Sequence, residues 1–244
     1  GNCPDYWHIS RTVCMNLPFY SRIPLTTGFL FTLLINLAGC GGGSDSSSAT
    51  GVTPTATVIT DSPAQTNKLP AEPLTLKEEE SLLFMREEEK LARDVYLYLY
   101  DIWGDTIFLN ISDSEQQHTD AVKELIEKYD LPDPAAGKVE GEFENLNLID
   151  LYDLLTAQGT ASLIDALIVG AQIEDLDIKD LNSQLLFINN ADIIQVYENL
   201  LKGSRNHLRA FTSRLTDLGF NYVPVYISQE SYDAIISSPV ERGP

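Results

Sequence analysis

Ser114-Glu115-Gln116-Gln117-His118 is the stretch of this 244-residue sequence that most narrows the choice of fold. Glu115 and His118 are three residues apart, so on an α-helix they lie on one face and can bind the same ion. The pair takes two positions of an apolar stripe with helical spacing, formed by Ile111, Val122, Leu125 and Tyr129. The stretch therefore predicts a helix from near Ser112 to the stop at Leu131-Pro132, with an acid and an imidazole pointing inward.

A long helix is predicted before this stretch, from the capping box Thr75-Leu76-Lys77-Glu78 to Trp103-Gly104-Asp105. Glu89 falls on its apolar stripe, which consists of Leu82, Met85, Ala92, Tyr96 and Leu99. The other charges of Lys77–Lys90 are predicted to form a mostly solvated face, and they include Glu78–Glu80, Glu87 and Glu88. Glu89 is therefore predicted to be the inward carboxylate of this helix.

Two more long helices are predicted after the Glu-x-x-His pair. One starts near Thr160 and carries Glu174 among apolar residues at helical spacing. The other runs from about Ala191 to a C-cap at Gly219, with His207 on its buried side. Each of the four long helices thus places an acid or a histidine on its inward face.

The connections complete the predicted architecture. Residues 135–147 form a long connection that is predicted to cross the end of the bundle, and residues 148–157 form a short helix. Residues 222–226 are predicted to be extended, and a short final helix opens at Ser228. Four long helices with one long crossover and a short C-terminal extension indicate an all-α four-helix bundle.

The inward acids and histidines favour a metal site. Carboxylates of Glu89, Glu115 and Glu174 would repel one another in the core unless cations lie between them. Neutral imidazoles of His118 and His207 add nitrogen ligands, and a mixed nitrogen and oxygen set suits iron or manganese, with zinc as a further candidate. The alternative for each histidine is a hydrogen-bonded core residue that binds no metal.

Two smaller features leave the ligand set open. Asp177 lies one turn beyond Glu174, where it is either a further ligand or part of a solvated edge. Ser204 stands three residues before His207, where a second Glu-x-x-His pair would have its acid. A single ion, or a weakly held second ion, is therefore an alternative to a complete two-metal site.

The segment Glu89-Lys90-Leu91-Ala92-Arg93-Asp94-Val95-Tyr96 resembles the first-helix motif of the ferritin-like superfamily, rubrerythrins especially. With Ser114–His118, Glu174–Asp177 and Ser204–His207, residues 75–236 resemble the ferritin-like family known as domain of unknown function 2202. The resemblance implies a ferritin-like four-helix bundle with a two-metal site. It places five residues at ligand positions, namely Glu89, Glu115, His118, Glu174 and His207, with Tyr96 near the metals and Ser204 as a departure from the expected acid.

The N-terminal part of the sequence is predicted to direct export. Met15 begins a segment with an apolar run over residues 26–37, and residues 1–14 are interpreted as lying upstream of the start. Leu37-Ala38-Gly39-Cys40 resembles a bacterial lipobox, in which Cys40 receives a lipid; the alternative is an ordinary secretory signal. Residues 41–74 are rich in Gly, Ser, Thr and Pro, which is typical of a flexible tether.

Composition and motifs together predict a class of function. The net charge of −20 argues against nucleic acid as a partner. We expect a domain over residues 75–236 with a tail over 237–244, anchored through Cys40 in a bacterial cell envelope, with a homodimer as one compatible assembly. Its expected role is metal handling or metal-dependent oxidation, as in an oxidoreductase. The alternative is a metal-free helical module that binds other proteins at the envelope.

Overall fold

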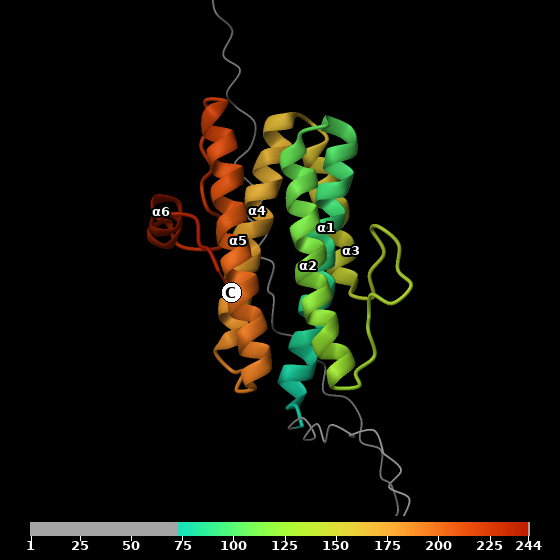
Figure 1. Cartoon of the computed structure of the whole chain (residues 1–244). Coiled ribbons are helices and arrows are strands. Elements are labelled where there is room, and N and C mark those ends of the chain that lie inside the picture. The colour runs from blue at the N-terminus through green and yellow to red at the C-terminus, as the bar shows by residue number, and fades with distance from the viewer. Residues whose placement is uncertain (1–72, 244) are drawn as a thin grey trace, which may run out of the picture. The chain divides into compact units, whose positions relative to one another are not determined.

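The computed structural model describes residues 73–243 (Figure 1), which contain six α-helices and no strand. The prediction of an all-α fold is confirmed. The helices are α1 (Leu76–Trp103), α2 (Thr106–Lys128), α3 (Leu146–Gly159), α4 (Leu163–Leu185), α5 (Ala191–Asp217) and α6 (Gln229–Ser237). The predicted signal segment, the lipid site at Cys40 and the tether up to residue 72 lie outside the described residues. None of the described helices is both long enough and apolar enough to cross a membrane.

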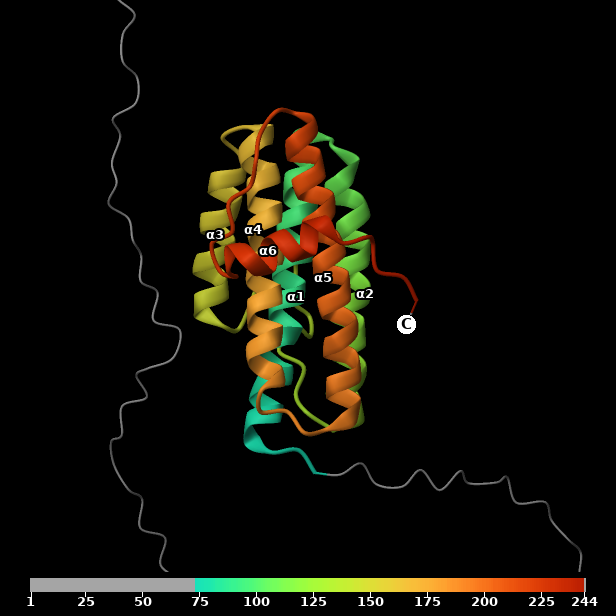
Figure 2. The same cartoon turned by 90° about the vertical axis from the view of Figure 1, so that its left-hand side faces the viewer.

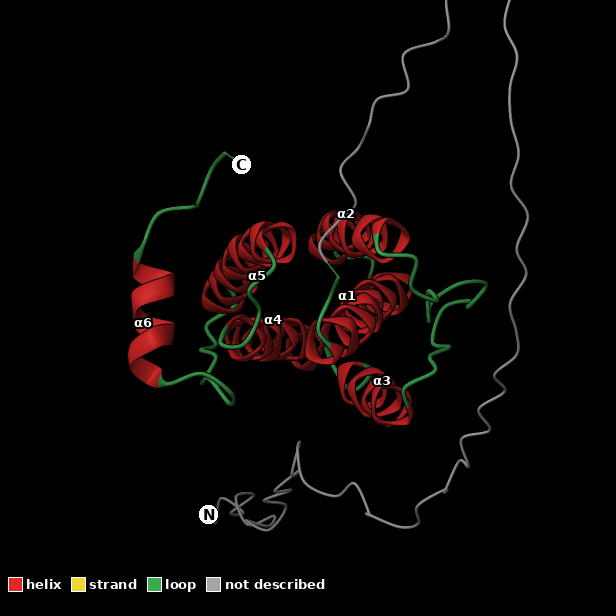
Figure 3. Ribbon diagram, turned by 90° about the horizontal axis from the view of Figure 1, so that it is seen from below, coloured by secondary structure: helices red, strands yellow, loops and turns green. Residues whose placement is uncertain are grey.

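The four long helices lie side by side, as the end-on view in Figure 3 shows. In Figure 1, α1 and α5 run in one direction while α2 and α4 run in the other. Because α2 and α4 are parallel, the chain between them must travel back along the length of the fold. It does so through residues 129–145 and α3, which packs against α1 and α4.

The crossover is held by buried charges of α1, and this corrects two predictions. Glu87 accepts hydrogen bonds from the backbone N–H groups of Glu144 and Asn145, and Asp94 accepts one from that of Gly141. The connection therefore follows the side of α1 instead of crossing the end of the bundle. The solvated face predicted for Lys77–Lys90 is likewise wrong in part, because five of its charged residues besides Glu89 are buried, namely Glu78, Arg86, Glu87, Glu88 and Lys90.

Helix α2 begins at Thr106, six residues before the predicted start at Ser112. Gly104 has a φ of 63°, a left-handed conformation that favours glycine and ends α1. Asp105 then caps α2 by accepting a hydrogen bond from the N–H of Ile107. This two-residue joint, Gly104-Asp105, needs no longer loop, so the apolar residues after it continue directly as helix.

The C-terminal extension is fixed by one buried acid. Asp175 on α4 accepts hydrogen bonds from the hydroxyl of Tyr222 and from the backbone N–H groups of residues 225–227. These bonds hold the chain after α5 against α4. Helix α6 then crosses the outside of α4 and α5 (Figure 2). Beyond it, the tail returns to α5, where Glu241 pairs with Arg205 and Arg209.

Candidate metal centre

Five side chains from the four long helices meet inside the fold. Helix α1 contributes Glu89, α2 contributes Glu115 and His118, α4 contributes Glu174, and α5 contributes His207. The three carboxylates are fully buried, and the imidazoles are almost so. We call these five residues the candidate centre. They are the set that the sequence predicted to point inward.

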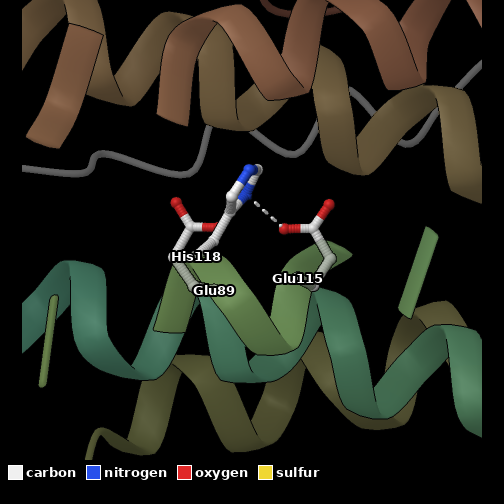
Figure 4. Close-up of side chains that lie close together, drawn as sticks. All are labelled: Glu89, Glu115 and His118. Atoms are coloured by element: carbon white, nitrogen blue, oxygen red, sulfur yellow. Dashed lines mark hydrogen bonds and ion pairs between the residues drawn. The ribbon is translucent and has the colours of Figure 1, made fainter. Parts of the chain in front are cut away.

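Glu89, Glu115 and His118 form the first of two groups of ligand atoms. One atom from each of them lies within 4.8 Å of the other two. Figure 4 shows these side chains turned toward one another from α1 and α2. The Nδ1 atom of His118 is 2.7 Å from Oε2 of Glu115 and 3.2 Å from Oε2 of Glu89.

The second group consists of Glu115, Glu174 and His207, again within 4.8 Å of one another. The Nδ1 atom of His207 is 2.7 Å from Oε1 of Glu115 and 3.5 Å from Oε2 of Glu174. The rings of His118 and His207 stack with centroids 5.5 Å apart. Glu115 is thus shared between the groups, with one oxygen beside each imidazole.

Several atoms of the centre lack the hydrogen bonds that buried polar atoms normally make. Unpartnered atoms are Oε1 of Glu89, Oε1 of Glu115, Oε2 of Glu174 and Nδ1 of His207. Nδ1 of His207 is close to Glu115, but the pair lacks hydrogen-bond geometry. Leaving such groups unsatisfied costs about 1–3 kcal/mol each. Cations would satisfy all of them, so the residues present fit a pair of metal ions.

The electrostatics of the metal-free centre depend on protons held by the histidines. Burial raises the pKa of Glu89 to about 7, although its contact with His118 acts in the opposite direction. Burial alone would raise the pKa of Glu115, but His118 and His207 outweigh it and hold that pKa well below its usual value. Burial lowers the pKa of His207, but Glu115 and Glu174 outweigh it and raise that pKa to about 10. When no metal is bound, protonated His118 and His207 therefore balance the charge of the buried carboxylates.

Two residues next to the centre orient its ligands. The hydroxyl of Tyr96 donates to Oε1 of Glu174 at 2.5 Å, so Tyr96 is both a core aromatic and a partner of a ligand. Ser114 Oγ lies 3.0 Å from Nε2 of His207. When Nδ1 of His207 is free to bind a cation, Nε2 carries the proton and donates it to this hydroxyl. Ser204, by contrast, donates to the carbonyl of Leu200 and makes no hydrogen bond to the five residues of the centre.

Gly203 on α5 is a positioning residue that the sequence analysis did not identify. A Cβ atom at this position would lie 2.4 Å from both Cε1 and Nε2 of His118, which is closer than atoms can approach. The absent side chain therefore makes the space that the His118 ring occupies. An isolated glycine in the middle of a helix, four residues before His207, is the sequence signal for it.

Asp177 is buried, so the alternative of a solvated edge is wrong for this residue. It belongs to neither group of ligand atoms, and both of its oxygens lack hydrogen-bond partners. Glu88 on α1, which was predicted to be solvated, is also buried, and both of its carboxylate oxygens lack hydrogen-bond partners.

Residues 78–239 match the family described as "Uncharacterized protein domain (DUF2202)", and the chain belongs to this family. It is 55% identical over 177 residues to "Uncharacterized protein MJ0754" of the archaeon Methanocaldococcus jannaschii, covering 72% of this chain and 96% of that protein. It also resembles the structure reported as "Crystal structure of hypothetical protein MJ0754 from Methanococcus jannaschii DSM 2661", with a TM-score of 0.70 and 55% identity. That match covers 71% of this chain and 99% of the solved one.

Proposed function

We propose that residues 75–236 form a ferritin-like domain that binds two transition-metal ions, iron or manganese, with Glu115 as the bridge between them. The observation that carries this proposal is the position of Glu115, which offers one oxygen to each of two ligand groups. Glu89 and His118 would complete one ion's protein ligands, and Glu174 and His207 the other's. This reading needs no acid at the position of Ser204, because a single shared carboxylate serves both ions.

The donor set favours iron or manganese over other ions. Each ion would receive two carboxylate oxygens and one imidazole nitrogen, a mixed set that also accommodates zinc but not the all-oxygen preference of calcium or magnesium. Three protein ligands leave further coordination positions for small molecules. Bound iron or manganese would supply redox chemistry toward dioxygen or peroxide at those positions. The activity we propose is therefore metal-dependent oxidation or metal handling.

The protein's own residues would hold and orient this chemistry. Tyr96 donates to Glu174 and so fixes one carboxylate, while Ser114 fixes the ring of His207. Burial of the three acids keeps bulk water away from them. The phenol of Tyr96 donates a hydrogen bond to Glu174, so these two side chains are placed to share a proton.

We also propose that the domain is tethered to a membrane by a lipid on Cys40, with residues 41–74 as the tether. The lipobox-like stretch Leu37–Cys40 supports this placement, as does the Gly- and Ser-rich composition after it. Expression of the full chain and of Cys40→Ser, followed by membrane fractionation, tests it. The unchanged chain should sediment with membranes and the variant should be soluble; equal distribution of the two would contradict the tether.

Metal content decides between the proposed function and a metal-free helical module. The protein is purified anaerobically, and its metal is measured for the unchanged chain, His118→Ala and His207→Ala. We expect about two ions for the unchanged chain and at most one for each variant, because each histidine serves one ion. A chelator should also lower the melting temperature, since a ligand that binds only the folded state stabilises it. No stoichiometric metal, with an unchanged melting temperature, would overturn the proposal in favour of the metal-free module.

A further inference from the structure

Three acids outside the candidate centre form a row between α1 and α4, two helices that lie side by side in Figure 3. Asp177 follows the ligand Glu174 by one helical turn, and Asp180 follows Asp177 by another. Glu88 lies on α1, directly before the ligand Glu89. We call Asp177, Glu88 and Asp180 the acidic row.

The two inner members of the acidic row are buried without compensation. Glu88 is 2% exposed and Asp177 is 1% exposed, and none of their four carboxylate oxygens has a hydrogen-bond partner. Neighbouring buried acids show what compensation looks like in this fold. Glu87 accepts two backbone N–H groups, and Asp175 accepts three as well as a phenol. Glu88 and Asp177, the two acids next to the centre, therefore lack the hydrogen bonds that the other buried acids make. Buried carboxylates without hydrogen bonds are groups that a cation stabilises.

The acidic row extends from the centre toward the surface. Its inner end lies beside the proposed ligands, because Asp177 is one turn from Glu174 and Glu88 is next to Glu89 in the chain. Asp180 is 9% exposed and pairs with Lys179, whose side chain is 38% exposed. The row thus begins beside the ligands and ends at solvent.

We propose that Asp177, Glu88 and Asp180 form the path by which divalent cations reach the candidate centre from the surface. A moving cation needs oxygen ligands that replace its water but hold it weakly enough to release it. Single carboxylates with free lone pairs, spaced along one helix interface, meet that need. At the outer end of the acidic row, the ammonium of Lys179 pairs with Asp180. An arriving cation would replace this ammonium at the Asp180 carboxylate.

The competing account is that these carboxyl groups are neutral acids that only fill space between α1 and α4. Neutral acids would be replaced by amides of the same shape with little effect on metal uptake. A cation path, in contrast, depends on their charge. The inference rests on the proposed function, because a path is useful only if the centre binds cations.

Rates of metal loading separate the two accounts. The full chain is freed of metal and mixed with Co²⁺, whose visible absorption reports binding, in a stopped-flow instrument. Glu88→Gln, Asp177→Asn and Asp180→Asn are compared with the unchanged chain and with Glu80→Gln. Glu80 is an exposed acid on α1, so its variant removes the same charge away from the row. Circular dichroism confirms that each variant is folded.

We expect the three row variants to load at least about tenfold more slowly than the unchanged chain, since aligned charges raise association rates by about this factor or more. Glu80→Gln should load at the unchanged rate, and all chains should reach the same final number of ions. Unchanged rates in the row variants would overturn the path while leaving the proposed function intact. A lower final number of ions in Asp177→Asn would make Asp177 a ligand and remove it from the path. An unchanged chain that binds no Co²⁺ would overturn the proposed function, and the path with it.

Discussion

The Nδ1 atom of His207 lies 2.7 Å from Oε1 of Glu115, across the interface between α5 and α2. The two atoms do not have the geometry of a hydrogen bond, so neither is satisfied by the other although they are close. The other oxygen of Glu115 has the same distance to His118. One carboxylate therefore joins two groups of ligands that would otherwise be separate.

Glu115→Gln should have a larger effect on metal binding than any other single ligand substitution. The amide removes the charge shared by both groups, so we expect both ions to be lost or bound at least about tenfold more weakly. Glu89→Gln, which touches only the first group, should leave one ion. Elemental analysis after dialysis against a metal buffer measures the difference. Two tightly held ions in Glu115→Gln would rule out the bridge.

Gly203→Ala should disturb the centre without unfolding the protein. The added methyl displaces the ring of His118, which is the flexible end of a side chain, whereas alanine favours the helix by about 1 kcal/mol. We expect affinity for one ion to fall about tenfold or more, with the melting temperature of the metal-free protein unchanged or higher. Calorimetric titration measures the affinity.

Ser204→Ala is the matched control for Gly203→Ala, because it changes the next residue of α5. Its hydroxyl donates only to the carbonyl of Leu200 in the described contacts, so metal affinity should be unchanged. Equal losses in the two variants would mean that any change in this part of α5 weakens binding. The steric role assigned to Gly203 would then be wrong.

Tyr96→Phe should weaken the second ligand group selectively. The hydroxyl donates to Oε1 of Glu174, and removing an outer partner of a ligand weakens metal affinity about 10- to 100-fold. The ring itself stays packed, so the fold should be kept. A competition titration with a chromophoric chelator resolves the two affinities. An equal loss for both ions, or none, would contradict the assignment of Glu174 to one ion.

Much of this arrangement follows from the sequence because helical periodicity is local information. Glu89, Glu115, Glu174 and His207 interrupt apolar stripes, and residues that share a stripe share a buried face. The four long helices were predicted for the same reason. The start of α2 was missed because two capping residues, Gly104 and Asp105, join α1 and α2 without a longer loop.

Other features depend on how separate helices meet, which periodicity does not encode. Glu87 and Glu88 were predicted to be solvated because they lie beside the stripe of α1 and not on it. The crossover covers Glu87 and α4 covers Glu88, so both are buried by elements remote in sequence. The space that Gly203 leaves for His118 likewise exists only once α2 and α5 are packed together.

Metal binding should release protons and strengthen as the pH rises. The pKa of His207 in the metal-free chain is raised to about 10, so its imidazole is charged at neutral pH, and it must be neutral to bind a metal. Each released proton makes the apparent affinity rise about tenfold per pH unit below that pKa. Calorimetry at pH 7 in two buffers with different ionisation enthalpies counts the protons. Binding without proton release would contradict the charged state assigned to His207.

The bridging role of Glu115 is tested most directly by anomalous diffraction from crystals of the protein grown with Mn²⁺ or Fe²⁺. We predict two anomalous peaks, one beside Glu89 and His118 and the other beside Glu174 and His207. Each peak should lie about 2.0–2.3 Å from its own oxygen of Glu115. A single peak, or two peaks of which only one contacts Glu115, would contradict a centre built on a shared carboxylate.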